Sequence, residues 1–335
     1  MHLNLSTVRI ENIYQQMKRI LLYFTLILLG GVVQAQEHYN IIVDRNGHGN
    51  FRNIQQAIDS ARAIKSTKTV TIFIKKGFYK EKIEIPSSVC NVRLVGEDCD
   101  KTIISYDDHA NINKMGTFRT YTLKICGNDI QLYNLTVENS AAQLGQAVAL
   151  HVEGDKVAFV NCRFLGNQDT VYTGKENARQ YFLNCYIEGT TDFIFGPSTV
   201  WFEGCNIFCK RNSYITAAST PENMKYGYIF NNCKIELADS VTAVYLGRPW
   251  RPYAMTLFMN CHLPKGIKPI GWDNWRNPAN EKTARYLEYN NTGEGAVSMG
   301  RAKWTKQLIE KDISEFTVGN VLKGKDNWNP TTIKN

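Results

Sequence analysis

The chain of 335 residues lacks several patterns that would place it quickly in a familiar class. It has no Gly-x-Ser-x-Gly segment, which excludes a serine hydrolase of the nucleophile-elbow type. Its six histidines show no spacing typical of metal ligands, so the sequence predicts neither a metal site nor a cofactor. Lysine and arginine outnumber aspartate and glutamate by 39 to 31, but they are scattered rather than clustered with aromatic residues. Nothing therefore indicates nucleic acid as a partner.

A hydrophobic run long enough to span a membrane is also missing. The apolar stretch at residues 20–29 follows two basic residues and is shorter than the about 20 residues that a transmembrane helix needs. Small residues follow it, and they end at Ala35 in a pattern typical of a signal-peptidase site. We therefore predict a signal peptide over residues 1–35, cleaved after Ala35. The mature domain, residues 36–335, is expected to be secreted or periplasmic and to carry no membrane anchor.

Nine cysteines in an exported protein would ordinarily indicate disulfide bonds, but five of them recur within a repeated pattern. Each copy has a short strand of alternating apolar residues, an Asn or Gly at a bend, a cysteine and another short strand. The repeated cysteines, separated by 23, 20, 28 and 28 residues, are Cys162, Cys185, Cys205, Cys233 and Cys261. Residues 130–137 form an earlier copy with leucine at the cysteine position.

A repeat of this length, made of short strands and turns without helical periodicity, indicates a parallel β-helix. One coil cannot bury its apolar face alone, so successive coils stack around a continuous core. We therefore predict an all-β fold, a right-handed, single-stranded parallel β-helix whose repeated cysteines point inward. We interpret these cysteines as free thiols, with disulfides between neighbouring coils as the alternative. The apolar stripe of Ile54, Ala57, Ile58 and Ala61 predicts a short helix that caps the N-terminal end.

The repeat places two aspartates in the same phase of consecutive coils. Asp169 lies seven residues after Cys162, and Asp192 lies seven residues after Cys185. Neighbouring strands lie about 4.8 Å apart, so the two carboxyl groups are expected to stack. Two carboxylates this close do not both ionise readily, and we expect one to keep its proton while the other stays charged.

That asymmetry suits ester hydrolysis by a carboxylate nucleophile, in which the second carboxyl group protonates the leaving alkoxide and then activates water. Gln168 adjoins Asp169, and Gln146 lies 23 residues before Asp169, so both amides are predicted to face the developing oxyanion. Arg248 is predicted to reach back to one aspartate and hold it ionised. The alternative is that the aspartates only cap turns of the solenoid, but the accompanying glutamines and arginine favour a catalytic column.

Five segments resemble the signature blocks of the pectin methylesterases, in the order and at the spacing typical of that family. These segments are residues 77–81, 146–150, 168–172, 192–196 and 246–250. The resemblance covers roughly residues 39–325. Each block alone is weak evidence, whereas five in order are specific.

The resemblance implies hydrolysis of the C6 methyl esters of pectin, with release of methanol. Asp192 would be the nucleophile, and Asp169 would be the proton donor and later the general base. Gln168 would stabilise the tetrahedral transition state with help from Gln146, and Arg248 would hold Asp192. Gln146 and Arg248 would also contact the substrate.

The same resemblance implies further substrate contacts. Trp250 would contact the galacturonate chain, and Thr117 resembles a substrate-contacting threonine with a shift of one residue. Tyr172, Phe193 and Phe195 would line the cleft unless they belong to the core. The expected partner is methyl-esterified polygalacturonate, and the expected state is a monomer.

Other activities found on a β-helix fit the sequence less well. A galacturonan hydrolase would need an aspartate cluster that does not accompany the Gly-His-Gly at residues 47–49, and a lyase would need an acidic calcium-binding cluster that is missing. A β-helix that only binds polysaccharide would have lost Asp169, Asp192, Gln168 or Arg248, and all four are present. An esterase or thioesterase for another acyl group stays open, since it would use the same chemistry.

Overall fold

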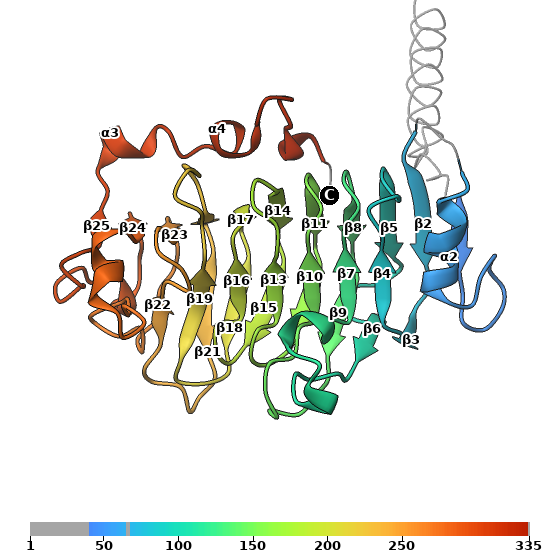
Figure 1. Cartoon of the computed structure of the whole chain (residues 1–335), viewed down its shortest axis with the longest axis horizontal. Coiled ribbons are helices and arrows are strands. Elements are labelled where there is room, and N and C mark those ends of the chain that lie inside the picture. Colours follow the sequence, from blue (N-terminus) through green and yellow to red (C-terminus); the bar gives the residue numbers. More distant parts are fainter. Residues whose placement is uncertain (1–39, 65–67, 334–335) are drawn as a thin grey trace, which may run out of the picture. The chain divides into compact units, whose positions relative to one another are not determined.

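The computed structural model describes residues 40–64 and 68–333, where three parallel sheets wind into a β-helix (Figure 1). The predicted all-β parallel β-helix is therefore confirmed. The predicted signal peptide and its cleavage position lie outside the described residues. Within the described ranges, no helix is both long enough and apolar enough to cross a membrane.

Each complete coil contributes one strand to each of three sheets, which we name A, B and C, and strands within a sheet pair in parallel. Sheet A contains β1 (Ile41–Val43), β2 (Val70–Ile74), β5 (Val92–Gly96), β8 (Gln131–Tyr133), β11 (Val157–Val160), β14 (Arg179–Leu183), β17 (Thr199–Glu203), β20 (Tyr228–Asn231), β23 (Met255–Met259), β24 (Arg285–Tyr289) and β25 (Lys306–Gln307). Sheet B contains β3 (Gly77–Lys80), β6 (Thr102–Tyr106), β9 (Thr136–Asn139), β12 (Arg163–Leu165), β15 (Tyr186–Gly189), β18 (Asn206–Cys209) and β21 (Lys234–Leu237). Sheet C contains β4 (Ile83–Ile85), β7 (Leu123–Ile125), β10 (Leu150–Val152), β13 (Val171–Thr173), β16 (Ile194–Gly196), β19 (Tyr214–Ala218) and β22 (Tyr245–Gly247).

Helices are few and short in the described part of the chain. The α-helices are α2 (Ile54–Ala61), α3 (Glu310–Ile313) and α4 (Val318–Leu322). The 3-10 helices are η1 (Ile112–Lys114), η2 (Thr117–Arg119), η3 (Pro278–Lys282), η4 (Glu294–Ala296) and η5 (Pro330–Thr332).

A left-handed backbone conformation marks the bend between a sheet A strand and the sheet B strand that follows it. The residues with positive φ at these bends are Asn134, Asn161, Asn184, Gly204 and Asn232, and Asn260 has the same conformation after β23. Asparagine and glycine tolerate this conformation better than most residues. The Asn or Gly before each repeated cysteine is therefore the residue that turns the chain into the next sheet.

Two columns of repeated side chains fill the interior. The five repeated cysteines are each at most 1% exposed, and all are free, as predicted. A stack of phenyl rings, with successive centroids 4.4, 4.8, 4.3 and 4.4 Å apart, is formed by Phe159, Phe182, Phe202, Phe230 and Phe258. Each of these rings lies three residues before a repeated cysteine, so the same repeat supplies both columns. Stacked pairs add about 0.5–1.5 kcal/mol each beyond the burial of their area.

Helix α2 lies where the apolar stripe predicted it, and all four residues of that stripe are buried. It packs against β1, β2 and β4, the first strands at the N-terminal end of the β-helix (Figure 1). The carboxylate of Glu81 accepts hydrogen bonds from the backbone N–H groups of Ile54 and Gln55, at 3.0 and 3.1 Å. The carboxylate therefore pairs with two backbone N–H groups that the first turn of the helix leaves without a partner inside the helix.

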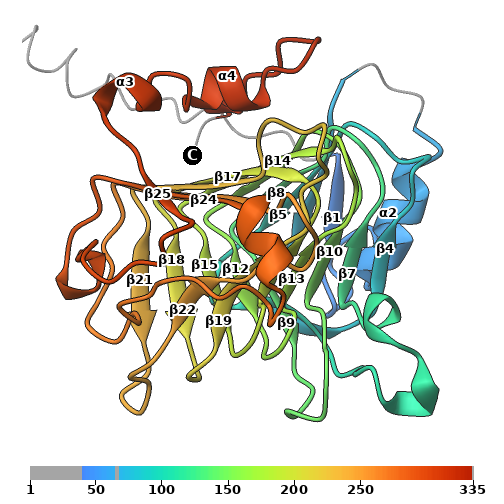
Figure 2. The ribbon, with the colours of Figure 1, turned by 60° about the vertical axis from the view of Figure 1, so that its left-hand side comes forward.

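The segment with α3 and α4 runs back along the outer face of sheet A (Figure 1; Figure 2). Helix α4 packs against β17 and buries Val321 and Leu322. Arg179 of β14 anchors the segment, since its guanidinium hydrogen-bonds both Asp155 and Asp326, at 2.6 and 2.5 Å. This face is thus covered, whereas the candidate site described next lies on sheet C.

Candidate active site

Asp169 and Asp192 lie just before β13 and β16, neighbouring strands of sheet C. Val171 pairs with Ile194, and the backbone N–H of Asp169 donates to the carbonyl of Thr191 at 3.1 Å. The two aspartates therefore occupy the same position in consecutive coils, as their spacing predicted. Both have left-handed backbone, with φ of 67° at Asp169 and 50° at Asp192. Aspartate tolerates this conformation better than most residues, and the stacked coils hold it in place.

The interval of 23 residues between Gln146 and Asp169 would place Gln146 directly over Asp169, but the structure puts Gln146 one position away. The backbone N–H of Ala147 donates to the carbonyl of Gln168 at 3.1 Å, which puts Gln146 level with Gln168 instead. Consecutive coils differ in length, so an equal sequence interval does not guarantee an equal position. Both glutamines still reach the same pocket as the aspartates.

A pocket of about 230 Å³ opens over these residues. Its lining comes from sheet C, from the turns before its strands and from two loops: Thr117, Phe118, Gln146, Gln168, Asp169, Asp192, Phe195, Ala217, Arg248, Trp250 and Trp275. Carboxyl, amide and guanidinium groups form one part of the lining and aromatic rings another. Such a surface suits a ring with an apolar face and a polar substituent.

Arg248 holds Asp192 by two hydrogen bonds. Its Nε donates to Oδ1 at 3.0 Å and its Nη2 donates to Oδ2 at 2.6 Å. The guanidinium also lies between two aromatic rings, with Cζ 3.9 Å from the ring centroid of Tyr214 and 3.8 Å from that of Trp275. Paired hydrogen bonds and two stacked rings fix the guanidinium plane, so the carboxylate of Asp192 is held in one orientation.

The two carboxyl groups have unequal electrostatic surroundings. Asp169 is 8% exposed and Asp192 is 6% exposed. Burial raises the pKa of Asp169 well above its usual value, the neighbouring Asp192 raises it further, and Arg248 lowers it. Burial also raises the pKa of Asp192, but the hydrogen bonds and charge of Arg248 oppose this rise, while Asp273 adds to it. Asp169 is therefore the more readily protonated of the pair.

Gln146 and Gln168 line the pocket, and their side-chain amides are available to hydrogen-bond a substrate. Among the described residues, neither side-chain amide makes a hydrogen bond to another protein group, although both residues line the pocket. Neutral N–H donors beside two carboxyl groups are suited to an oxyanion that forms during acyl transfer.

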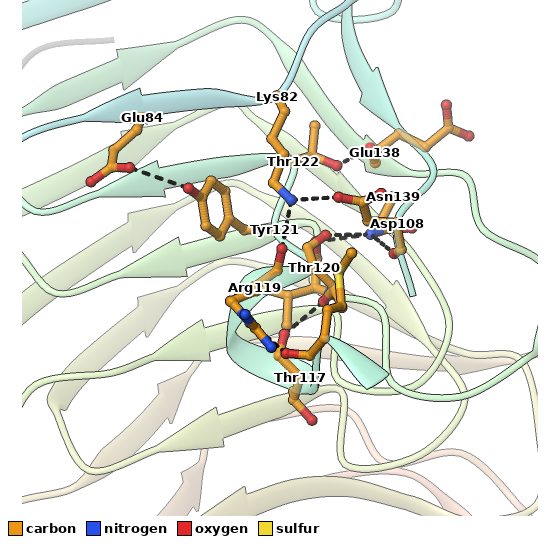
Figure 3. A network of polar contacts seen from close by, with 12 residues as sticks. Lys82, Glu84, Asp108, Thr117, Arg119, Thr120, Tyr121, Thr122, Glu138 and Asn139 are labelled. Atoms are coloured by element: carbon orange, nitrogen blue, oxygen red, sulfur yellow. Dashed lines mark hydrogen bonds and ion pairs between the residues drawn. The ribbon is translucent and has the colours of Figure 1, made fainter. Parts of the chain in front are cut away.

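A network of polar contacts holds η2 in place (Figure 3), and η2 carries Thr117 and Phe118, which line the pocket. Thr120 Oγ1 donates to the carbonyl of Thr117 at 2.7 Å, and Asn139 Nδ2 donates to the carbonyl of Thr120 at 3.0 Å. Lys82 Nζ donates to the carbonyl of Arg119 at 2.6 Å. These contacts fix the segment that carries Thr117 and Phe118 to the pocket edge.

The structure separates the predicted substrate contacts into two groups. Thr117 and Trp250 line the pocket, as does Phe195. Tyr172 does not line it, but its ring lies 4.8 Å from that of Phe118 and 4.7 Å from that of Phe195, and so it supports both.

The prediction that Phe193 lines the cleft is wrong. Phe193 is 1% exposed and belongs to the interior core, where Gly189 leaves room for its ring. The turn at Asp192 interrupts the alternation of the strand, so both Phe193 and Ile194 point inward. The next residue, Phe195, is the one that faces the pocket.

Sequence reasoning missed Phe118, Ala217, Trp275 and Tyr214. Ala217 pairs with Phe195 across β16 and β19, so the strand register would have revealed it. Trp275 lies in a loop after β22, and no periodic signal marks it. Within residues 40–64 and 68–333, no group of three or more His, Cys, Asp or Glu side chains is arranged to hold a metal ion.

Fold and site together define a class: a parallel β-helix that carries, on the outer face of one sheet, a stacked pair of aspartates with an arginine on one of them. The pectinesterase family model matches residues 40–325. The chain therefore belongs to the pectinesterase family.

Known relatives and solved structures agree with this assignment. The chain is 35% identical over 285 residues to Pectinesterase 31 of Arabidopsis thaliana, covering 82% of this chain and 89% of the relative. It covers only 52% of Probable pectinesterase/pectinesterase inhibitor 64 of the same plant, at 33% identity over 88% of this chain. A pectin methylesterase from carrot superimposes with a TM-score of 0.83 at 31% identity, covering 89% of this chain and 97% of that one. One from Erwinia chrysanthemi gives 0.76 at 29% identity, covering 88% and 99%.

Proposed function

We propose that the chain is a pectin methylesterase that hydrolyses C6 methyl esters of polygalacturonate through an acyl-enzyme on Asp192. The observation that carries this proposal is the unequal carboxyl pair, in which Arg248 holds Asp192 by two hydrogen bonds while Asp169 stays buried without such a partner. Membership of the pectinesterase family supports the choice of ester.

The first half-reaction makes the acyl-enzyme and methanol. An oxygen of ionised Asp192 attacks the C6 carbonyl, and the carbonyl oxygen becomes an oxyanion that the amides of Gln168 and Gln146 stabilise by hydrogen bonds. The C–O bond to the methoxy group then breaks as Asp169 gives its proton to the leaving oxygen. Methanol departs, Asp169 is left ionised, and the galacturonate C6 is joined to Asp192 as an anhydride.

The second half-reaction restores the enzyme. Ionised Asp169 removes a proton from a water molecule, whose oxygen attacks the C6 carbonyl of the anhydride. The bond to Asp192 breaks, and Arg248 stabilises the carboxylate that Asp192 regains. The product forms as a carboxylic acid that loses its proton to the solvent, and Asp169 holds the proton needed for the next ester.

The rest of the pocket serves the sugar. Trp250 and Phe118, whose ring centroids are 6.5 Å apart, present flat faces to a pyranose ring, and Thr117 adds a hydroxyl group. We also propose that the protein is exported, with cleavage after Ala35, because residues 20–35 resemble a secretory signal and pectin lies outside the cell that would secrete the enzyme.

The test is release of methanol from highly methylated pectin by the purified chain of residues 36–335. The proposal predicts steady methanol release that leaves the galacturonate backbone at its original length. Pectin binding without methanol release would favour a binding module. Methanol release accompanied by chain shortening would point instead to an additional backbone-cleaving activity.

A further inference from the structure

We propose that His151 is a positioning residue whose protonation fastens η2, and with it Phe118, to sheet C. This inference rests on the proposed function, because it assigns a support to the same pocket. His151 lies in β10 between Leu150 and Val152, which point into the core, so it faces outward from sheet C. It is nevertheless only 2% exposed. Other side chains therefore cover this imidazole and separate it from the solvent.

Three aromatic rings form that cover. The imidazole meets the ring of Tyr172, its neighbour on β13, nearly edge-on with 4.8 Å between centroids. The rings of Tyr121 and Phe118 lie at 6.0 and 6.4 Å from it, also at steep angles. Phe118 is the one of the three that lines the pocket, and it is 45% exposed, so its position depends on the rings beneath it. His151 is thus one of the side chains that support Phe118.

The two ring nitrogens of His151 have different surroundings. Nε2 lies 2.8 Å from Oε1 of Glu153, whose carboxylate also pairs with Nζ of Lys124 at 3.3 Å. Nδ1 is buried and makes no hydrogen bond to any described residue. A proton on the ring is favoured by the backbone of Phe118, whose carbonyl is an acceptor, and Nδ1 is the nitrogen left to donate to it. Within residues 40–64 and 68–333, that carbonyl accepts no hydrogen bond from another backbone N–H group.

A neutral imidazole cannot serve both acceptors at once. It carries one N–H group, and the carboxylate of Glu153 takes it at Nε2. Nδ1 then presents a lone pair to a carbonyl oxygen, so two acceptors face each other. An imidazolium carries N–H groups on both nitrogens and donates to Glu153 on one side and to Phe118 on the other. Protonation therefore adds a hydrogen bond between sheet C and the segment that carries Phe118.

The surroundings of His151 place this protonation in acidic solution. Burial lowers the pKa of His151 below its usual value and the charge of Lys124 acts in the same direction, whereas hydrogen bonding with Glu153 and with the backbone of Phe118 opposes them. Burial would raise the pKa of Glu153, but His151 and Lys124 bring it below its usual value. Glu153 thus stays ionised while His151 takes up its proton.

Other titratable and charged groups lie on the elements that pack around His151. They are Lys82, Glu84 of β4, Arg119 of η2, Tyr121, Cys126 and Tyr172 of β13. Burial raises the pKa values of Tyr121, Cys126 and Tyr172, so these three are neutral where His151 titrates. The hydroxyl group of Tyr121 donates to Glu84 at 3.2 Å (Figure 3). Glu153 therefore remains the charged group that His151 contacts directly.

The test compares KM for methanol release from highly methylated pectin by the parent and by His151→Gln, between about pH 4 and pH 8. Glutamine takes up no proton, and the ionisation of Asp169 and Asp192 is common to both proteins. We expect the KM of the variant to exceed that of the parent about two- to tenfold in acid, the size of one net hydrogen bond, with little change in kcat. The ratio of the two KM values should decline as His151 loses its proton. A ratio that is the same at every pH would overturn the proposal, because His151 would then only fill space.

His151→Arg is the second variant, since a guanidinium keeps donors for both acceptors at every pH. Its KM is expected to stay near the acid value of the parent throughout the pH range. His48→Gln is the matched control, because the side chain of His48 is 83% exposed in the loop after β1. It removes an imidazole elsewhere on the molecule and should keep the parental KM profile. The proposal is also overturned if His48→Gln changes that profile as His151→Gln does.

Hydrogen exchange gives a readout that needs no catalysis. Protection of the backbone N–H groups of residues 117–120, corrected for the intrinsic pH dependence of exchange, should rise in the parent on acidification and stay level in His151→Gln. Level protection in the parent would overturn the proposal whether or not the variants fold. A parent that gains this protection but releases no methanol would refute the proposed function and leave the proton-dependent contact of His151 in place.

Discussion

At the scale of single residues, the site depends on two buried carboxyl groups of which only one has a cation. Burial alone would push the pKa of both Asp169 and Asp192 upward. Arg248 opposes this rise mainly at Asp192, which it contacts through both carboxylate oxygens. One neutral acid and one anion side by side are the two partners that an acyl transfer needs.

Arg248→Gln is predicted to damage catalysis and to move its pH dependence. Without the guanidinium, the pKa of Asp192 rises further, so the ionised nucleophile appears only at higher pH. We expect kcat for methanol release to fall by about 10²–10³-fold near neutral pH, the size typical of losing a buried charge partner. The acidic limb of the pH–rate profile should move to higher pH. An unshifted acidic limb would mean that Arg248 does not set the ionisation of Asp192.

Asp169→Asn is predicted to abolish turnover but to stabilise the fold at neutral pH. The folded-state pKa of Asp169 is raised above its unfolded value, so the folded protein binds this proton more tightly. The associated stability is fully present below the unfolded pKa and is lost as pH rises towards the folded pKa. Asparagine, which is neutral throughout, should raise the free energy of unfolding by about 0.5–2 kcal/mol at pH 7. Urea denaturation at pH 7 and pH 3.5 checks this, and a gain no larger at pH 7 than at pH 3.5 would contradict it.

Sequence reasoning reached most of the polar residues that line the candidate site but not the direction of every side chain. The phase of the repeat placed Asp169 and Asp192 correctly because both follow a cysteine by the same interval. It could not show that Phe193 points into the core while Phe195 faces the pocket, since the left-handed turn at Asp192 shifts the alternation of the strand. It also placed Gln146 one position away from where it lies, because the coil between β10 and β13 is shorter than the coil between β13 and β16.

At the scale of the element, the bends between sheets A and B are where the type of residue matches the backbone conformation most closely. Asparagine or glycine precedes each repeated cysteine, and those residues have positive φ. The repeat therefore predicted the β-helix without any helical or hairpin signal. It did not predict the phenyl stack, although a phenylalanine three residues before each cysteine was visible.

Asn184 offers a direct test of these bends, because it is exposed and has a φ of 52°. Asn184→Ala is predicted to lower the free energy of unfolding by about 1–2 kcal/mol, the cost of a left-handed conformation for a residue with a Cβ. Asn184→Gly removes the side chain equally but tolerates the conformation, and it should cost less than alanine. Chemical denaturation of the two variants gives the comparison, and equal losses would show that the side chain rather than the backbone matters.

At the scale of the whole molecule, the site is assembled from coils and loops that lie far apart in the sequence. Tyr214, Arg248 and Trp275 form one stack although they come from β19, the turn after β22 and a later loop. Parallel coils bring such residues together by stacking, which a sequence repeat predicts only for residues inside the repeat. The loop residue Trp275 carries no such signal.

Export is the prediction at this scale that falls outside the described residues. If the signal peptide is cut after Ala35, the mature protein begins at Gln36. N-terminal sequencing of protein recovered from outside the cytoplasm should read Gln36 or its cyclised form. Recovery with residues 20–35 still attached would contradict the prediction.

The most direct test of the whole account is the rate of methanol release by Asp192→Asn on highly methylated pectin, measured beside the parent and after both proteins show cooperative thermal unfolding. Asparagine keeps the size and backbone preference of Asp192 but cannot attack the ester. The account predicts that the parent releases methanol and that the variant is slower by about 10⁴-fold or more. A variant within tenfold of an active parent would contradict it, because Asp192 would then not be the nucleophile.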